Sequence, residues 1–218
     1  MIDPIVAIVL SYFSTYTLIS LCKSHESIRM LIKKYIREFR LNDSYGLITN
    51  DDIKFFQGVH TINLFNSRMI TDRGLEYLKG VRSIDLSRCY QITDRGLEYL
   101  KGVEIIDLSN CDKITDAGLE YLKGVSRINL SFCKQVTDAG LEYLSGVDNI
   151  DLSFCGKITD RGLGHLKGVR RINLFCCYEI TDAGLEHLRG VEEIVLTFYS
   201  EVTDEGLECL RGARISRL

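Results

Sequence analysis

The sequence lacks an excess of charge of either sign. Its 27 lysine and arginine residues nearly balance its 30 aspartate and glutamate residues, and the formal net charge is −3. Proteins that bind nucleic acid usually carry a basic patch or stripe. The charge pattern therefore gives no indication of a nucleic-acid partner.

The sequence is also poor in residues that could serve catalysis outside a repeated pattern. It has four histidines, and two of them, His165 and His187, stand where other copies of a repeat have tyrosine. The recurring aspartates, such as Asp94, stand at predicted helix starts, where a negative charge is favourable. All but three of the 18 glycines fall on two repeat positions, so no phosphate-binding loop is indicated. We expect a protein that is not an enzyme and holds no metal or cofactor.

What the sequence does contain is a stretch of 22 residues that recurs without insertion. A fixed period of this size predicts a solenoid, in which each unit buries its apolar side chains only against its neighbours. Seven full copies and a partial one begin at Ile48, Ile70, Ile92, Ile114, Val136, Ile158, Ile180 and Val202.

Two periodicities alternate within each copy. Around Ile106 and Leu108 the apolar residues are two apart, as they are in a short strand. In the other segment of a copy, residues 93–102, Leu97 and Leu100 are three apart, as apolar residues are on a helix. Each coil is therefore predicted to contain one strand and one short helix.

The ends of the predicted helix carry their own signals. Thr93 or Asp94 can cap the helix N-terminus. Gly102 can take the left-handed conformation that ends a helix.

The eight cysteines do not have the distribution of a disulfide scaffold. Five of them share one repeat position and would stack along the solenoid at the strand spacing of about 4.8 Å. A zinc or redox site needs ligands that converge from several directions, so we favour buried, reduced thiols that pack as small hydrophobes. Free thiols are typical of a reducing compartment, and we expect a cytoplasmic or nuclear protein. The five are Cys89, Cys111, Cys133, Cys155 and Cys177.

The repeat resembles a known family. Val103-x-x-Ile106-x-Leu108-x-x-Cys111, with Ile-Thr-Asp-x-Gly-Leu in every copy, is similar to the cysteine-containing leucine-rich repeat of F-box/LRR proteins. The resemblance implies an α/β fold, a leucine-rich-repeat solenoid over residues 46–218 with parallel strands on the concave face and short helices on the convex face. The family's repeats usually run a few residues longer, so the helices should be trimmed here.

Residues 1–45 lack the repeat. No charged residue lies between Pro4 and Cys22, which raises the alternative of a membrane or signal segment. That run contains five hydroxyl residues, and no basic residue precedes it as one would in a signal peptide. We favour three short helices, with a break at Ser14 and Thr15. The third carries the apolar stripe Ile28, Leu31, Ile32, Tyr35 and Phe39.

This N-terminal segment resembles a degenerate F-box. Asp3-Pro4, Val9-Leu10-Ser11-Tyr12-Phe13, then Leu18, Leu21 and Cys22-Lys23 follow the F-box order of a Leu-Pro start, an apolar core and a Val-Cys-Lys segment. It departs from that pattern in spacing, and Ser24 replaces the usual aromatic residue after the lysine. The alternative is a purely structural cap, because an open solenoid end must be covered. The resemblance implies adaptor contacts from Pro4, Ile8, Leu10, Tyr12, Phe13, Leu18 and Leu21.

A second candidate surface lies on the repeats. Phe132, Phe154, Phe175 and Phe198, hereafter the Phe row, stand just after the second strand leucine in consecutive coils. These rings could fill the core, or they could form an exposed apolar patch near arginines, a composition enriched at binding hot spots. The strand column that contains Asp151 should face the concave side, either as solvated surface or as a contact. The predicted substrate contacts are Arg127, Phe132, Asp151, Phe154, Arg171, Phe175 and Phe198.

Together the two resemblances imply a substrate-recognition subunit of a Skp-cullin-F-box ubiquitin ligase. Its partners would be the Skp adaptor, the cullin ligase and a protein substrate, with no nucleic acid and no membrane. One rival is a free-standing leucine-rich-repeat scaffold with a helical cap. The other is a membrane-tethered or secreted receptor, with oxidised cysteines and glycans at Asn42 or Asn129.

Overall fold

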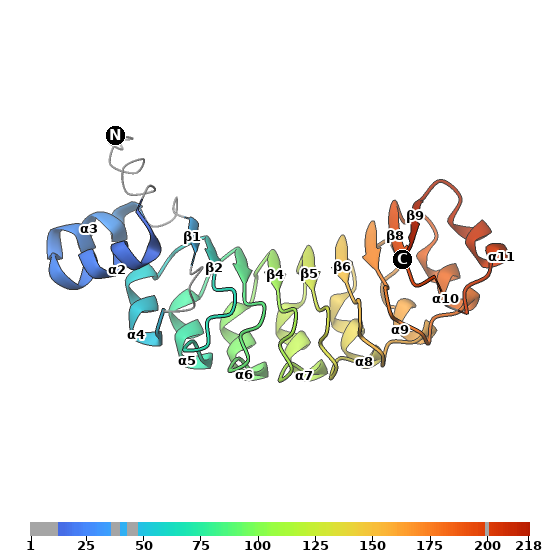
Figure 1. Ribbon diagram of the computed structural model, residues 1–218, viewed down its shortest axis with the longest axis horizontal. Coiled ribbons are helices and arrows are strands. Elements are labelled where there is room, and N and C mark those ends of the chain that lie inside the picture. The colour runs from blue at the N-terminus through green and yellow to red at the C-terminus, as the bar shows by residue number, and fades with distance from the viewer. Residues whose placement is uncertain (1–12, 36–39, 43–47, 199–200) are drawn as a thin grey trace.

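The computed structural model describes residues 13–35, 40–42, 48–198 and 201–218. Within these residues nine strands form one parallel sheet in the order β1 to β9, so every strand lies beside the next one in sequence. Figure 1 shows an elongated solenoid with the strands along one long side and the short helices along the other. The predicted α/β leucine-rich-repeat fold is confirmed.

The strands are short and evenly spaced along the chain. Their bounds are β1 Arg40–Asn42, β2 Thr61–Asn63, β3 Ser83–Asp85, β4 Ile105–Asp107, β5 Arg127–Asn129, β6 Asn149–Asp151, β7 Arg171–Asn173, β8 Glu193–Leu196 and β9 Arg214–Arg217.

The N-terminal helices are longer than those of the repeats. They are α2 Thr15–Ser24 and α3 Glu26–Tyr35. The repeats contribute the single turns α4 Asn50–Ile53, α5 Asp72–Leu75, α6 Asp94–Leu97, α7 Asp116–Leu119, α8 Asp138–Leu141, α9 Asp160–Leu163, α10 Asp182–Leu185 and α11 Asp204–Leu207. Most of them continue into a 3-10 turn: η2 Lys54–Phe56, η3 Glu76–Leu78, η4 Glu98–Leu100, η5 Glu120–Leu122, η6 Glu142–Leu144, η7 Glu186–Leu188 and η8 Glu208–Leu210.

The repeat period sets the strand register. Ile84 pairs with Ile106 and Ile106 with Ile128, so equivalent residues of successive coils stand side by side. The central residue of each strand from β2 to β7 is buried, while its two neighbours are half-buried or exposed. The core is therefore a row of identical layers.

The predicted helix signals act as expected at the ends. The Thr93 hydroxyl oxygen accepts a hydrogen bond from the backbone N–H of Arg95 at 3.3 Å, which is an N-cap. Gly102, at φ +83°, ends the turn in the left-handed region. Between them the chain makes one α-helical turn followed by one 3-10 turn.

The recurring aspartates at the helix starts also form hydrogen bonds to the next coil, which the sequence analysis did not predict. Asp94 reaches into the next coil, where one carboxylate oxygen accepts the backbone N–H of Thr115 at 2.8 Å and the other its hydroxyl at 2.7 Å. The same pair of bonds joins Asp72 to Thr93 and Asp116 to Thr137. These carboxylates therefore hold adjacent coils together, as well as opening a helix.

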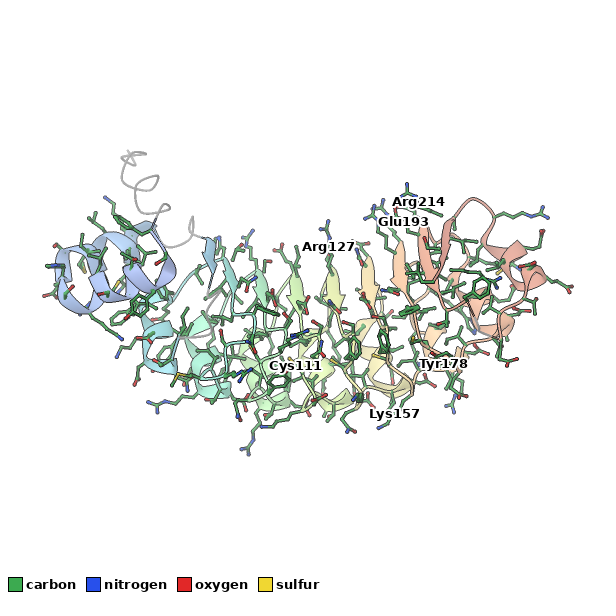
Figure 2. All side chains as sticks on the ribbon, viewed as in Figure 1. Cys111, Arg127, Lys157, Tyr178, Glu193 and Arg214 are labelled. Carbon is green, nitrogen blue, oxygen red and sulfur yellow. The ribbon has the colours of Figure 1, made fainter. Side chains whose placement is uncertain are left out.

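The cysteine prediction is confirmed for packing. All eight cysteines are free, and the five of the shared position are buried. The Cys111 thiol donates to the backbone carbonyl of Leu86 at 3.2 Å, and burial raises its pKa to about 12. Figure 2 shows Cys111 inside the solenoid, between strands and helices.

The N-terminal helices close the first coil. α2 packs on α3, and α3 packs on η2. Leu18, Ile19, Cys22 and Ile32 join the same core cluster as the repeats. The break predicted at Ser14 is the N-cap of α2, because the Ser14 hydroxyl oxygen accepts the Thr17 N–H at 3.1 Å.

Two parts of the N-terminal prediction turn out differently or lie elsewhere. The helix predicted from Pro4 to Tyr12, and the end of the third helix at Phe39, fall outside the described residues. Between α3 and the first repeat, the structure has strand β1, which the sequence did not predict. It pairs with β2, because the first repeat strand would otherwise leave its backbone edge open.

No helix in residues 13–35, 40–42, 48–198 or 201–218 is both long enough and apolar enough to cross a membrane.

Candidate functional site

The Phe row is a surface feature rather than core. The Phe132 and Phe154 rings stack face to face, with their centroids 4.1 Å apart. Phe154 also meets Phe175 edge to face at 5.3 Å. Phe132 and Phe175 are half-buried, whereas Phe154 and Phe198 are 38% and 62% exposed. Three of the four rings therefore form one continuous aromatic surface across coils, and the fourth is the most exposed.

Two rings of this surface start from an unfavourable backbone. Phe132 has φ 62° and Phe154 has φ 61°, both in the left-handed region. A bulky residue is rare there, whereas asparagine is tolerated. Two other coils do place asparagine at this position, Asn66 and Asn110. The equivalent residues Arg88 and Cys176 are also left-handed, so this conformation belongs to the repeat turn, and two coils place phenylalanine in it.

Backbone hydrogen bonds between coils fix these rings in place. The Phe132 N–H donates to the Ser153 carbonyl at 3.0 Å, and the Phe154 N–H donates to the Phe175 carbonyl at 2.9 Å. The parallel pairing of the sheet is thereby continued into the turn. The direction of each ring is set by the stacking of coils, so the aromatic surface is preorganised.

The Asp/Asn column on the concave face has a structural role. One Asp151 carboxylate oxygen accepts the Ser153 N–H at 2.8 Å and its hydroxyl at 2.6 Å, and the other accepts the Asn173 amide at 2.9 Å. Asp151 also lines a shallow concave groove of about 660 Å³ over β2 to β6. Both of its carboxylate oxygens already have partners, so its predicted substrate contact would have to share them.

The two predicted arginines differ. Arg171 is paired with Glu193 at 3.3 Å, and Glu193 in turn with Arg214 at 2.9 Å. Arg127 is exposed and lines the groove, next to the exposed Ile105 of the neighbouring strand. Figure 2 shows Arg127 pointing away from the helices, on the strand side. Of the two guanidinium groups, Arg127 is the more available to a partner.

Asn129 is unsuited to carry a glycan. Its side-chain amide donates to the Asp107 carboxylate at 2.9 Å, and its amide oxygen accepts the Ser131 N–H at 2.9 Å. A sugar on that nitrogen would disrupt the turn after β5. This geometry counts against the receptor alternative at Asn129.

The predicted adaptor contacts are only partly described. Pro4, Ile8, Leu10 and Tyr12 lie outside the described residues. Phe13 is 42% exposed, Leu21 is half-buried, and Leu18 is 2% exposed. Leu18 therefore belongs to the core and offers no surface to an adaptor.

Two side-chain contacts in the turns after the strands were not predicted from the sequence. Arg88 lies over the Phe65 ring, 5.7 Å from its centroid, and the Tyr178 hydroxyl donates to the Cys176 sulfur at 3.4 Å. Cys176 shares the left-handed position with Phe132 and Phe154. The asparagines at the equivalent positions, Asn66 and Asn110, were the signal in the sequence for this left-handed conformation.

Among the residues that the structure describes, no three histidine, cysteine or acidic side chains are grouped so that they could hold a metal ion.

The chain is similar to leucine-rich-repeat proteins. The leucine-rich-repeat family matches residues 103–123 and 125–145, which are two adjacent repeats. No curated protein sequence matches the chain.

Three solved structures are similar to this one. The yeast Rad7 and Elc1 complex has a TM-score of 0.53 and 14% identity, and the match covers 87% of this chain and 70% of that one. Internalin C2 of Listeria monocytogenes has a TM-score of 0.53 and 19% identity, and the match covers 78% of this chain and 84% of that one. The TLR13–ssRNA13 complex has a TM-score of 0.66 and 13% identity. The match covers 85% of this chain and 30% of that one, so this chain spans less than a third of that protein. At these identities the similarities establish the fold.

Proposed function

We propose that this leucine-rich-repeat protein is a substrate-recognition subunit of a Skp-cullin-F-box type ubiquitin ligase. The repeats hold a protein substrate at the Phe row, the N-terminal segment binds the Skp adaptor, and the chain does no chemistry itself.

The observation that carries the protein-binding role is the strained, exposed aromatic surface. A non-glycine residue in the left-handed region costs roughly 1–2 kcal/mol. Phe132 and Phe154 incur this cost at positions where the same fold accepts asparagine. Backbone strain of this kind is typical of functional sites. A row of rings on a rigid scaffold supplies the aromatic anchors that dominate protein interfaces.

The adaptor role is supported by the F-box resemblance and by the Rad7–Elc1 neighbour, which was crystallised as a complex. In the described part of the N-terminal segment, Phe13 and Tyr16 are exposed on or beside α2, at 42% and 66%. These two rings, with the predicted contacts Pro4, Ile8, Leu10 and Tyr12, make up the proposed adaptor surface. Leu18 is excluded from it because it is buried.

A reducing compartment, the cytosol or the nucleus, fits the cysteines. All eight are free. The thiols at the shared repeat position, the ladder cysteines, donate to backbone carbonyls and do not pair with one another. An oxidising environment would select for disulfides in a protein with this many cysteines.

A second candidate function is a free-standing interaction scaffold. It is favoured by the burial of Leu18, Ile19 and Cys22 in the core cluster, which is what a cap over the first coil requires. The two functions differ only in what the outer surface of the N-terminal segment binds.

Binding of purified Skp adaptor to the full chain, measured by biolayer interferometry, separates the two. Point variants are preferable to deletion, because removal of α2 and α3 would uncover the core. We expect Leu10→Asp with Phe13→Asp to abolish binding, and Phe154→Asn to leave it unchanged. A folded wild-type chain that fails to bind the adaptor would refute the ligase assignment and leave the scaffold.

A further inference from the structure

We infer that the Phe row and a neighbouring strip of lysines form a binding site for an extended acidic segment of a partner protein that carries aromatic or aliphatic anchors. This inference rests on the proposed protein-binding role and specifies the chemistry of the ligand.

Two of the lysines lie on the same loops as Phe132 and Phe154, and the third lies on the equivalent loop of the preceding coil. Lys134 follows Phe132 by two residues, and its backbone N–H donates to the Phe132 carbonyl at 3.0 Å. Lys157 follows Phe154 by three residues, and Lys113 occupies the position equivalent to Lys157 two coils earlier. All three are exposed. We call Lys113, Lys134 and Lys157 the basic strip.

The charges of the basic strip are oriented but not neutralised. The Lys113 ammonium donates to the Gln91 side-chain oxygen at 3.1 Å, and the Lys157 ammonium to that of Gln135 at 3.2 Å. A neutral amide positions a lysine and leaves its full charge and its remaining N–H groups free for a partner. In the described part of the chain, none of the three lysines has a carboxylate within ion-pair distance.

Cations on the convex face are treated differently. Lys101 pairs with Glu98 at 3.7 Å, and Lys123 pairs with Glu120 at 3.8 Å. In these two coils the repeat supplies its own counter-ion. On the loops beside the Phe row, a partner is left to supply it.

The acidic residues of the neighbouring loops limit the coils at which an acidic ligand could bind. Asp112 precedes Lys113, and Glu179 and Glu201 occupy the equivalents of Lys157 in the last coils. At these two loop positions lysine occurs in three consecutive coils, those of Lys113, Lys134 and Lys157. Figure 2 shows Lys157 on the helix side of its loop and Tyr178 closer to the strands. A ligand would lay apolar side chains on the rings and direct carboxylates toward the helix side.

The dimensions fit a short extended peptide. The three touching rings lie in consecutive coils, so they span about 10 Å at the strand spacing. An extended chain covers this distance in about three residues. Single-stranded nucleic acid is disfavoured, because the stacked rings of Phe132 and Phe154 leave no gap for a base.

The test is fluorescence anisotropy of the full chain with labelled synthetic probes of equal length. They are an alternating Asp–Phe peptide, an alternating Lys–Phe peptide, an alternating Asp–Ser peptide and an oligouridine. We expect the Asp–Phe peptide to bind at least tenfold more tightly than each of the others. Added salt should weaken its binding.

Charge reversal locates the site. Lys134→Glu with Lys157→Glu should move the preference to the Lys–Phe peptide, while the matched convex-face variant Lys101→Glu with Lys123→Glu should not. Equal binding of both Phe peptides to the wild type would overturn the acidic preference and leave the Phe row standing. If neither Phe peptide binds more tightly than the Asp–Ser peptide, the proposed aromatic site is overturned as well. Oligouridine binding as tight as that of the Asp–Phe peptide would overturn the peptide assignment.

Discussion

The carboxylate of Asp94 fills the space that a side chain at Gly118 would need. A Cβ placed on Gly118 would lie 2.4 Å from the Asp94 carboxylate oxygen that accepts the Thr115 N–H. The glycine has an ordinary helical backbone, so it is required by this close approach and not by a left-handed conformation. From Asp72 onward, each junction between repeats therefore joins an aspartate, a threonine and a glycine, and Asn50 takes the place of the aspartate in the first junction.

The first prediction tests this junction. Gly118→Ala should displace Asp94 and lower the free energy of unfolding by about 2–3 kcal/mol, because hydrogen bonds to a charged group contribute about 1.5–3 kcal/mol. The urea midpoint measures the effect. Gly156→Ala is the matched control, since a Cβ there meets nothing within 4 Å. In an Asp94→Ala background the Gly118→Ala change should cost little, and an undiminished cost there would contradict the account.

The second prediction concerns the Phe row. Phe132→Asn with Phe154→Asn should change the free energy of unfolding by less than about 1 kcal/mol. The loss of ring stacking, about 0.5–1.5 kcal/mol, is offset by relief of two left-handed phenylalanines. Phe56→Ala is the comparison, because that buried ring should cost about 3–5 kcal/mol. Guanidinium titration of both variants checks this, and a double-variant loss near that of Phe56→Ala would place the Phe row in the core.

The third prediction concerns thiol reactivity. With Ellman's reagent at pH 8, only the half-buried Cys176 and Cys209 of the folded chain should react readily. Burial raises the pKa of Cys111, Cys155 and Cys177 to about 12, so hardly any thiolate is present. All eight should react in denaturant, and Cys176→Ser should remove one fast thiol. Fast reaction of the ladder cysteines would argue against a closed core.

The fourth prediction concerns acid. Asp52 is buried, which by itself would raise its pKa, but its ion pair with Lys23 at 2.6 Å and the Thr49 hydrogen bonds outweigh burial and hold the pKa below its usual range. A lowered pKa means that Asp52 stabilises the folded state fully above about pH 4, the ordinary value, and loses this effect as pH falls further.

The comparison variant for the acid prediction is Asp52→Asn. The difference in urea midpoint between wild type and variant should be greatest near neutral pH and shrink below pH 4, because the other carboxylates titrate equally in both proteins. A difference that is independent of pH would show that the carboxylate charge does not hold the cap to the first coil.

The repeating part of the fold could be predicted from the amino-acid sequence. The 22-residue period placed Ile84, Ile106 and Ile128 side by side in one sheet, and local chemistry placed the Thr93 cap and the left-handed Gly102. These features depend on contacts within one coil, or on a repeat that fixes the neighbour by symmetry. For the same reason the buried cysteine column could be predicted.

The contacts between side chains of different coils, and the side chains that remain exposed, could not be predicted from the sequence and follow from the three-dimensional packing. The reach of Asp94 to Thr115, the stacking of Phe132 on Phe154 and the burial of Leu18 depend on how coils and helices are oriented against one another. Periodicity fixes the order of the coils but not the direction of each bond from Cα to Cβ. That direction follows from the backbone conformation of the turn, which is left-handed at Phe132 and Phe154.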